Sequence, residues 1–144
     1  MLNQKALKQY QNVGAKSAVE EATPHRLVQM LMDGALSRIA AAAGHIERRE
    51  VALKGAAIGQ AISIIGGLQG SLDLEKGGDI ATNLDRLYDY MTRRLTEANI
   101  ENDAAKLQEV RGLLAEIKGA WDQIPGKLGS ENGRVAGADK AVSP

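Results

Sequence analysis

The chain contains no cysteine and no phenylalanine, and only one tryptophan and three tyrosines supply aromatic bulk. Without cysteine there is no disulfide framework, no thiolate metal site and no cysteine nucleophile, which agrees with a reducing compartment. Without phenylalanine, the core must be built mainly from Ala, Leu, Ile and Met. These slim aliphatic side chains suit closely packed helices.

Charge of neither sign prevails, because 18 Lys and Arg balance 18 Asp and Glu. This balance lacks the electrostatic footprint of proteins that bind nucleic acid or anionic membranes, so we expect a protein partner and no nucleic acid. The N-terminal residues MLNQKALKQYQN lack the apolar stretch of a secretory signal. Ser63, Gly66 and Gly67 interrupt the apolar run 61–68, so we also expect no membrane span and a cytoplasmic location.

Four segments show the apolar spacing of helices, and none shows sustained strand-type alternation. They cover residues 23–46, 51–72, 79–100 and 103–124. Thr23 is a candidate N-cap followed by Pro24 at the first helical position, and Asp79 is a natural N-cap after the paired glycines 77 and 78. In the last segment the apolar residues, Trp121 among them, follow the a/d spacing of a helix packed nearly parallel or antiparallel to its neighbours.

Short connections between helices of similar length predict an all-α fold, an antiparallel up-down four-helix bundle. We assign the bundle to residues 23–124 and expect residues 125–144, which are rich in Gly and Ser, to be a disordered tail. Residues 1–22 form a separate N-terminal segment with a short amphipathic edge on which Tyr10 and Val13 lie. This segment is a candidate lid over a binding groove.

The second helical segment carries a stripe of small residues along one edge, which comprises Gly55, Gly59, Ser63, Gly66 and Gly70. Each Gly in a helix interior costs about 1 kcal/mol relative to Ala, so the stripe is expensive unless another backbone lies close to it. That backbone could belong to a neighbouring helix of the same bundle. Alternatively, the stripe is a groove that accepts a helix or strand of another protein.

No set of residues assembles into a catalytic or metal site, and we expect neither enzyme activity nor a cofactor. His25 and His45 lie near opposite ends of one predicted helix, about 30 Å apart, so they cannot share a metal or a proton. His45, with Arg48 and Arg49 nearby, could be the phosphorylated histidine of a phosphotransfer bundle. A solvated histidine at the end of a helix is the simpler interpretation.

The segment VEEATPHRLVQMLMDGAL at residues 19–36 resembles the opening signature of the flagellar secretion chaperones (FliS), and Tyr10 precedes it as in that family. Further matches follow in order and spacing at Lys54-Gly55, residues 61–68, Ser71-Leu72-Asp73, Gly77-Gly78, Asn83-Leu84, residues 87–91 and Arg93-Arg94-Leu95. Trp121 stands where many members carry a Trp in the last helix. Met32 departs from the family pattern, which has an aromatic residue at that position.

The resemblance implies a cytoplasmic helical bundle that binds the disordered C-terminal region of flagellin, prevents premature polymerisation and delivers flagellin to the flagellar export gate. The flagellar anti-sigma factor is a further candidate partner. The tail after Pro125 is not part of the shared pattern, so no function is carried onto it.

The candidate client site combines the glycine stripe with apolar side chains at helical spacing nearby. Its residues are Tyr10, Val13, Met30, Gly55, Gly59, Ile64, Gly66, Leu68, Leu72, Leu87, Tyr88 and Met91. We expect Met30 to lie outside the core face of its helix and the other apolar residues to supply pockets. The alternative is a non-enzymatic four-helix adaptor or regulatory module that dimerises through the glycine face.

Overall fold

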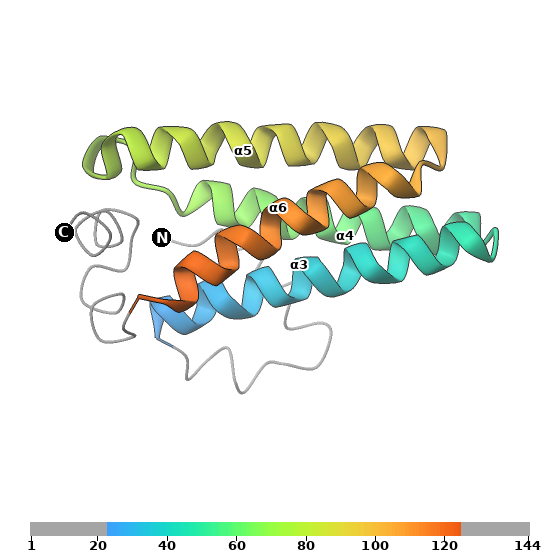
Figure 1. Ribbon diagram of the computed structural model, residues 1–144, viewed down its shortest axis with the longest axis horizontal. Coiled ribbons are helices and arrows are strands. Elements are labelled where there is room, and N and C mark those ends of the chain that lie inside the picture. Colours follow the sequence, from blue (N-terminus) through green and yellow to red (C-terminus); the bar gives the residue numbers. More distant parts are fainter. Residues whose placement is uncertain (1–22, 125–144) are drawn as a thin grey trace.

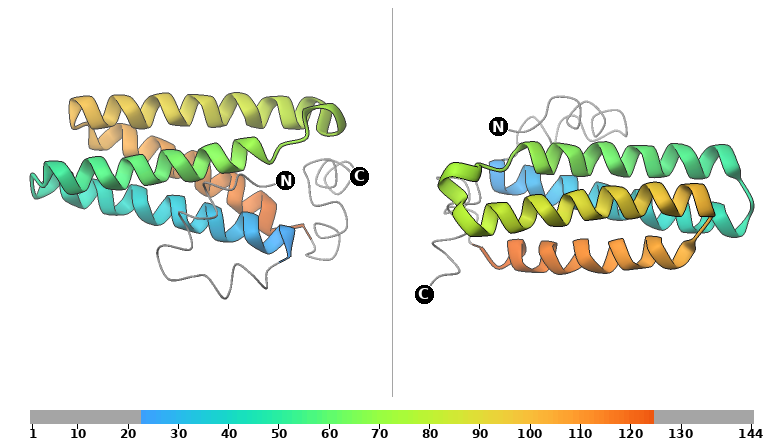
Figure 2. Two further views of the ribbon diagram at one scale, coloured as in Figure 1. Left: turned by 180° about the vertical axis from the view of Figure 1, so that it is seen from behind. Right: turned by 90° about the horizontal axis from the view of Figure 1, so that it is seen from above.

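The computed structural model describes residues 23–124, which form four α-helices. The helices are α3 (Pro24–Glu47), α4 (Val51–Gly70), α5 (Leu74–Glu101) and α6 (Ala104–Asp122). Each runs antiparallel to the helix before it, as Figures 1 and 2 show. Helix α3 packs against α4 and α6, and α5 closes the bundle by packing against the same two helices. The predicted four-helix bundle is therefore confirmed.

Three of the four helices begin with a side chain that caps the first turn. The Thr23 hydroxyl accepts a hydrogen bond from the backbone N–H of Arg26 at 3.1 Å, with Pro24 as the first helical residue. The carboxylates of Asp73 and Asp103 cap α5 and α6 in the same way. Such caps satisfy backbone donors that have no partner within the helix. The predicted starts of the first and last helices are thus explained by local chemistry.

Helix α5 is interrupted at Gly78, whose backbone (φ 55°, ψ −135°) is not helical. A positive φ of this kind is readily adopted only by glycine. The regular part of α5 after this break starts at Asp79, but the predicted N-cap role of Asp79 is wrong, because Asp73 caps the helix one turn earlier. The structure adds a turn before the break, from Leu74 to Gly77, which the Asp73 cap stabilises and which the sequence analysis assigned to a connection.

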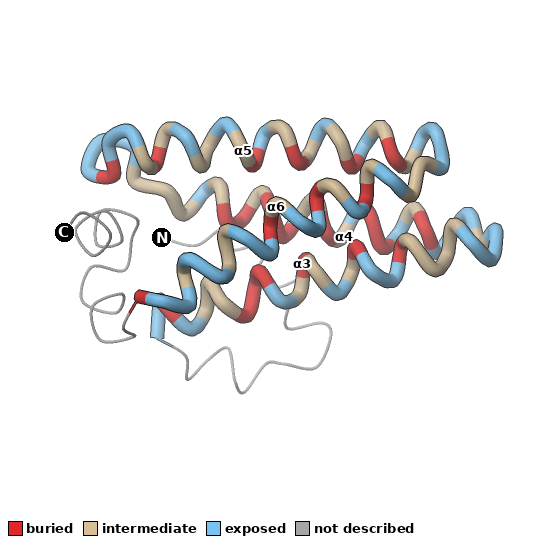
Figure 3. The backbone as a smooth tube through the Cα atoms, in the orientation of Figure 1, coloured by how far each residue is buried: buried red, intermediate tan, exposed pale blue. Residues whose placement is uncertain are grey.

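The core consists of one main apolar cluster contributed by all four helices, which Figure 3 shows as the buried inner side of each. Its fully buried large side chains are Leu31, Met32, Ile39, Ile58, Ile64, Ile65, Leu68, Met91, Leu95, Leu107, Val110 and Leu114. Met32, where the resemblance leads us to expect an aromatic residue, is one of them. Leu and Ile supply most of this bulk, as expected for a chain without phenylalanine.

The first turn of α3 is joined to the last turn of α6 by His25 and Trp121. The two rings stack with their centroids 5.0 Å apart and an interplanar angle of 16°. His25 Nε2 donates to the Trp121 carbonyl, and Trp121 Nε1 donates to the His25 carbonyl, each at 3.0 Å. Trp121 also packs against both apolar clusters. This paired contact closes the bundle between its first and last helices.

A polar network fastens α5 to α6 along their exposed edge. The Glu109 carboxylate accepts hydrogen bonds from the Tyr90 hydroxyl and from Arg94 Nε. Lys106 forms ion pairs with Glu97 and Glu101. The bonds from Tyr90 and Arg94 hold the pKa of Glu109 below its usual value. Because the groups are only partly buried and water screens their charges, we expect the network to set the helix register more than the stability.

By length and composition, α4 would suffice to cross a membrane, a test that core helices of water-soluble proteins also pass. In the structure it packs against α3 and α5, and its 20 residues include eight buried ones. The apolar character of α4 is thus explained by its place in the bundle.

We predict that Trp121→Ala lowers the free energy of unfolding by about 3 to 5 kcal/mol, because it removes the ring that packs on His25 and on both clusters. Urea unfolding followed by far-ultraviolet circular dichroism measures this loss. Trp121→Phe is the matched control, since it keeps a ring but loses the bond to the His25 carbonyl, and should cost only about 0.5 to 1.5 kcal/mol. A Trp121→Ala protein as stable as the parent chain would contradict the structural role.

Candidate functional site

The glycine stripe of α4 lies on the outside of the described bundle. A Cβ atom added at Gly55, Gly59 or Gly66 would meet nothing within 4 Å. Gly59 is exposed, and Gly55 and Gly66 are partly exposed. On the helical wheel the stripe lies opposite Ala61, which is fully buried. No other helix of residues 23–124 therefore uses the close approach that the glycines permit, which leaves an edge about 22 Å long with little side-chain bulk.

The apolar residues that the sequence analysis grouped with this stripe lie in the interior instead. Ile64, Leu68, Tyr88 and Met91 are at most 3% exposed and belong to the main core cluster. Burial raises the pKa of the Tyr88 phenol, so its hydroxyl stays neutral. These four side chains hold the helices together and form no open pocket in this conformation.

The remaining predicted site residues are separated from one another. Leu72 and Leu87 are partly buried against the core. Met30 is only 5% exposed, so the prediction of an open position on α3 is wrong, although Met30 joins neither apolar cluster of the described residues. Tyr10 and Val13 lie outside the described residues. The structure therefore brings together the glycines but not the apolar residues expected to accompany them.

A polar contact borders the stripe on the side of α5. Gln69 Nε2 donates to the carboxylates of Asp85 at 2.9 Å and Asp89 at 3.1 Å. One side-chain amide thus bridges two successive turns of α5 and fixes the spacing between α4 and α5 beside Gly66.

Four large apolar side chains are exposed among residues 23–124, at 52 to 75% of their surface, and the sequence analysis placed none of them in the site. They are Val51, Leu53, Leu74 and Ile100. Val51 precedes the stripe on α4 by one turn, and Leu74 follows the end of α4. Isolated exposed apolar residues are common, but bulky ones at both ends of a stripe of small residues provide apolar area where the stripe itself has little.

Lys54 is a charged residue with an exposed fraction of only 5%. Its ammonium donates to the Asn99 carbonyl at 2.8 Å and to Asn102 Oδ1 at 2.5 Å. Asn102 is the left-handed C-cap of α5 (φ 54°). Lys54 therefore satisfies acceptors at the carboxyl end of α5, where the helix dipole also favours a cation. This contact explains why a lysine is retained beside the stripe.

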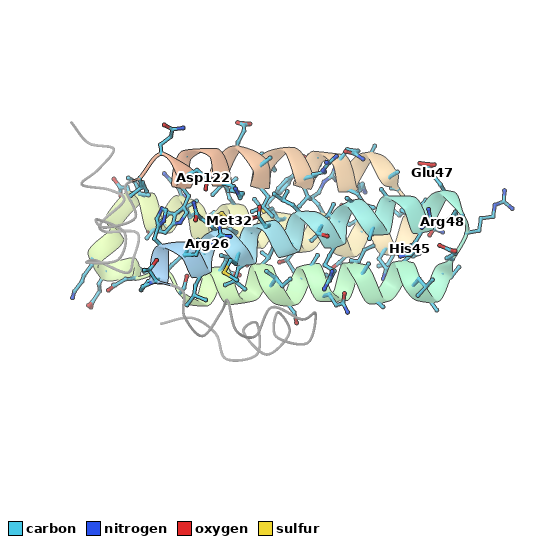
Figure 4. The ribbon with its side chains drawn as sticks, turned by 90° about the horizontal axis from the view of Figure 1, so that it is seen from below. Arg26, Met32, His45, Glu47, Arg48 and Asp122 are labelled. Atoms are coloured by element: carbon cyan, nitrogen blue, oxygen red, sulfur yellow. The ribbon has the colours of Figure 1, made fainter. Side chains whose placement is uncertain are left out.

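A cavity of about 330 Å³ lies where α3 turns into α4, next to the end of α5. Its lining includes His45, Arg49, Glu50, Lys54 and Asn102. His45 Nδ1 donates to Glu50 Oε1 at 2.7 Å, and Arg48 Nε donates to the same oxygen at 2.9 Å. These two bonds lower the pKa of Glu50. His45 is thus engaged with a carboxylate rather than freely exposed. Figure 4 shows His45 and Arg48 at one end of the bundle, with Arg26 and Asp122 at the other.

A second hollow, of about 430 Å³, lies between α3 and α6. Its lining consists of Leu36, Ser37, Ala40, Gln108, Arg111, Gly112 and Ala115.

Across residues 23–124, no group of three or more His, Asp or Glu side chains is placed to hold a metal ion. The features of the described bundle that remain open to a ligand are therefore surfaces and shallow hollows, which suit another polypeptide better than a small substrate.

Comparison with known proteins agrees with this geometry. The family model described as "Flagellar protein FliS" matches residues 6–128. The flagellar secretion chaperone FliSB of Pseudomonas aeruginosa is 54% identical over 124 residues, which cover 86% of this chain and 98% of the relative. The flagellar secretion chaperone FliS of Salmonella typhimurium is 48% identical over 135 residues, 93% of this chain and 100% of the relative. The FliS protein of Vibrio cholerae is 43% identical over 83% of this chain and 88% of its own.

The match extends through all four helices, the caps at Thr23 and Asp103, and the glycine edge of α4. The family model and the aligned relatives together cover the whole four-helix bundle. The chain belongs to the flagellar protein FliS family of flagellar secretion chaperones.

Proposed function

We propose that this protein binds the disordered C-terminal region of flagellin in the cytoplasm, prevents its premature polymerisation and delivers it to the flagellar export gate. Membership of the flagellar secretion chaperone family supports the class of client. The observation that carries the proposal is the open glycine edge of α4, because a Cβ at Gly55, Gly59 or Gly66 would meet nothing. The anti-sigma factor remains a further candidate partner through the same family relationship.

The area that such a client must cover exceeds the glycine edge. A disordered segment that folds on binding pays several kcal/mol for ordering, and such interfaces bury on the order of 1,000 to 3,000 Å². An edge about 22 Å long cannot supply this area alone. The client must therefore continue past the stripe, and the exposed Val51 and Leu74 at its two ends are the natural first extensions.

The alternative function is an adaptor that dimerises through the same glycine face. The adaptor function predicts a stable dimer that does not bind flagellin, whereas the chaperone function predicts a 1:1 complex with flagellin. Light scattering after size-exclusion chromatography, with full-length flagellin and with flagellin lacking its C-terminal region, distinguishes the two.

We predict that Gly59→Leu and Gly66→Leu abolish flagellin binding with little effect on stability, because each new side chain points away from the core and blocks the edge. Gly119→Leu on α6 is the matched control, since a Cβ there also meets nothing within 4 Å but lies on a different helix. Calorimetric titration with the flagellin C-terminal region measures binding, and urea unfolding measures stability. The groove assignment is wrong if both α4 variants unfold, or if they bind the client as the parent does.

Alanine at the same positions should separate folding from binding. We expect Gly59→Ala and Gly66→Ala each to raise the free energy of unfolding by up to about 1 kcal/mol, because helix propensity improves and the added methyl meets no neighbour. Flagellin affinity should nevertheless fall, since a methyl group keeps a close-packed client backbone at a greater distance. A loss of stability on either substitution would show that the glycines serve packing within the bundle.

The lid hypothesis concerns residues 1–22 and so lies outside the described residues. We propose that Tyr10 and Val13 cover part of the client surface until flagellin displaces them. Amide hydrogen exchange at Leu2 to Val13 should then show protection in the free protein that changes when the flagellin C-terminal region is added. Exchange at random-coil rates in both states would exclude the lid.

A further inference from the structure

The cavity between the α3–α4 turn and the end of α5 carries positive charge that its own residues leave uncompensated. Within residues 23–124, Lys54 and Arg49 take part in no ion pair, whereas the single carboxylate of the lining, Glu50, already accepts bonds from His45 and Arg48. Lys54 is only 5% exposed, and burying its charge costs free energy unless an anion or several hydrogen-bond acceptors surround it. The lining thus favours a further negative group.

The hydrogen bonds of Lys54 leave room for one more acceptor. An ammonium carries three N–H donors, and two of them are used by the Asn99 carbonyl and Asn102 Oδ1. The role of Lys54 at the end of α5 accounts for those two bonds. It does not account for the cavity that Lys54 lines together with Arg49 and His45.

The backbone of the α3–α4 turn holds Arg49 in an unusual conformation at this cavity. Its φ of 58° is rare for a residue with a side chain and costs free energy unless the surroundings fix it. The bonds from Arg49 N to the Ile46 carbonyl and from Glu50 N to the His45 carbonyl fix the turn. A glycine would adopt this conformation more easily, so the turn itself gives no reason for an arginine.

The rim of the cavity includes one exposed apolar side chain, Val51, which is 68% exposed. Ile100, which is 75% exposed, lies outside the lining but in the last turn of α5, two residues before Asn102. A free inorganic anion would gain nothing from these side chains. A polypeptide that presents a carboxylate between apolar residues would use both the cations and the rim. The chemistry of the whole site therefore fits a protein partner better than a small ion.

We propose that this cavity is a second protein-binding site, which takes a glutamate or aspartate side chain flanked by apolar residues from a partner protein. The carboxylate accepts hydrogen bonds from Lys54 and Arg49, and the flanking residues rest on Val51 and Ile100. The site lies at the end of the bundle where α3 turns into α4, which is marked by His45 in Figure 4. The His25–Trp121 contact lies at the opposite end, where α3 begins and α6 ends. A partner bound here leaves most of the glycine edge uncovered. The proposal does not depend on flagellin being the client.

The test is a titration of the ¹⁵N-labelled full-length protein in phosphate-free buffer with two peptides, acetyl-Leu-Glu-Leu-amide and acetyl-Leu-Gln-Leu-amide. The Glu peptide should shift the amide signals of Arg49, Lys54 and Asn102 in a saturable way. The Gln peptide should bind at least about tenfold more weakly, because it lacks the charge. A purely structural role of Lys54 and Arg49 would not distinguish the two peptides.

Arg49→Gly removes the guanidinium while glycine keeps the left-handed backbone, so the variant should fold normally and bind the Glu peptide at least about tenfold more weakly. Lys54→Met serves as a second variant and should show the same loss, together with lower stability. Arg86→Gln, an exposed arginine elsewhere on α5, is the control and should bind like the parent. Equal affinity for the two peptides, no shift with the Glu peptide, or tighter binding of inorganic phosphate than of the Glu peptide would overturn the proposal.

Discussion

The interior of the bundle is filled from one side of each helix, and this constraint decides which helix faces remain free to contact a partner. Helix α4 is apolar around most of its circumference, yet among residues 23–124 it packs mainly against α3 and α5 and buries the half that contains Ala61, Ile64, Ile65 and Leu68. If its outer half carried bulky apolar side chains, the free protein would expose an aggregation-prone apolar surface along one whole helix. Small residues limit that exposure and still allow a partner to approach the backbone closely. The outer half of α4 therefore remains available without making the isolated bundle prone to association.

Most of the fold follows from the sequence because helical periodicity reports which residues share a buried face. The four helices were predicted in this way, and the cap at Thr23 was predicted from its place before Pro24, since each depends on residues close together in the chain. The extra turn before Gly78 was not predicted. It depends on the Asp73 cap and on a positive φ at one of two adjacent glycines, and the apolar pattern contains no information about either.

The candidate site was predictable only in part, for a physical reason that differs between its residues. Glycines at spacings of three and four residues mark one edge of α4 whatever that edge faces, so the stripe could be found. Ile64 and Leu68 could not be sorted into core or surface, because a helix without a polar side has no periodicity that distinguishes inside from outside. The pairing of Lys54 with Asn99 and Asn102 joins residues more than 40 positions apart, and only the folded chain brings them together.

The two ends of the bundle are built from different chemistry, and the difference bears on the proposed second binding site. At the end where α3 begins and α6 ends, His25 and Trp121 satisfy each other's polar groups and leave little for a ligand to use. At the opposite end, Lys54 and Arg49 have no carboxylate partner among the described residues. Val51, in the same cavity lining, and Ile100, in the last turn of α5, are exposed. A surface that is both charged and apolar offers a protein partner an ion pair and an apolar contact at the same place. The glycine edge begins one turn beyond Val51. Since the client and the second protein are both proposed to contact Val51, they would compete at this end of α4, although the rest of the glycine edge stays open to the client.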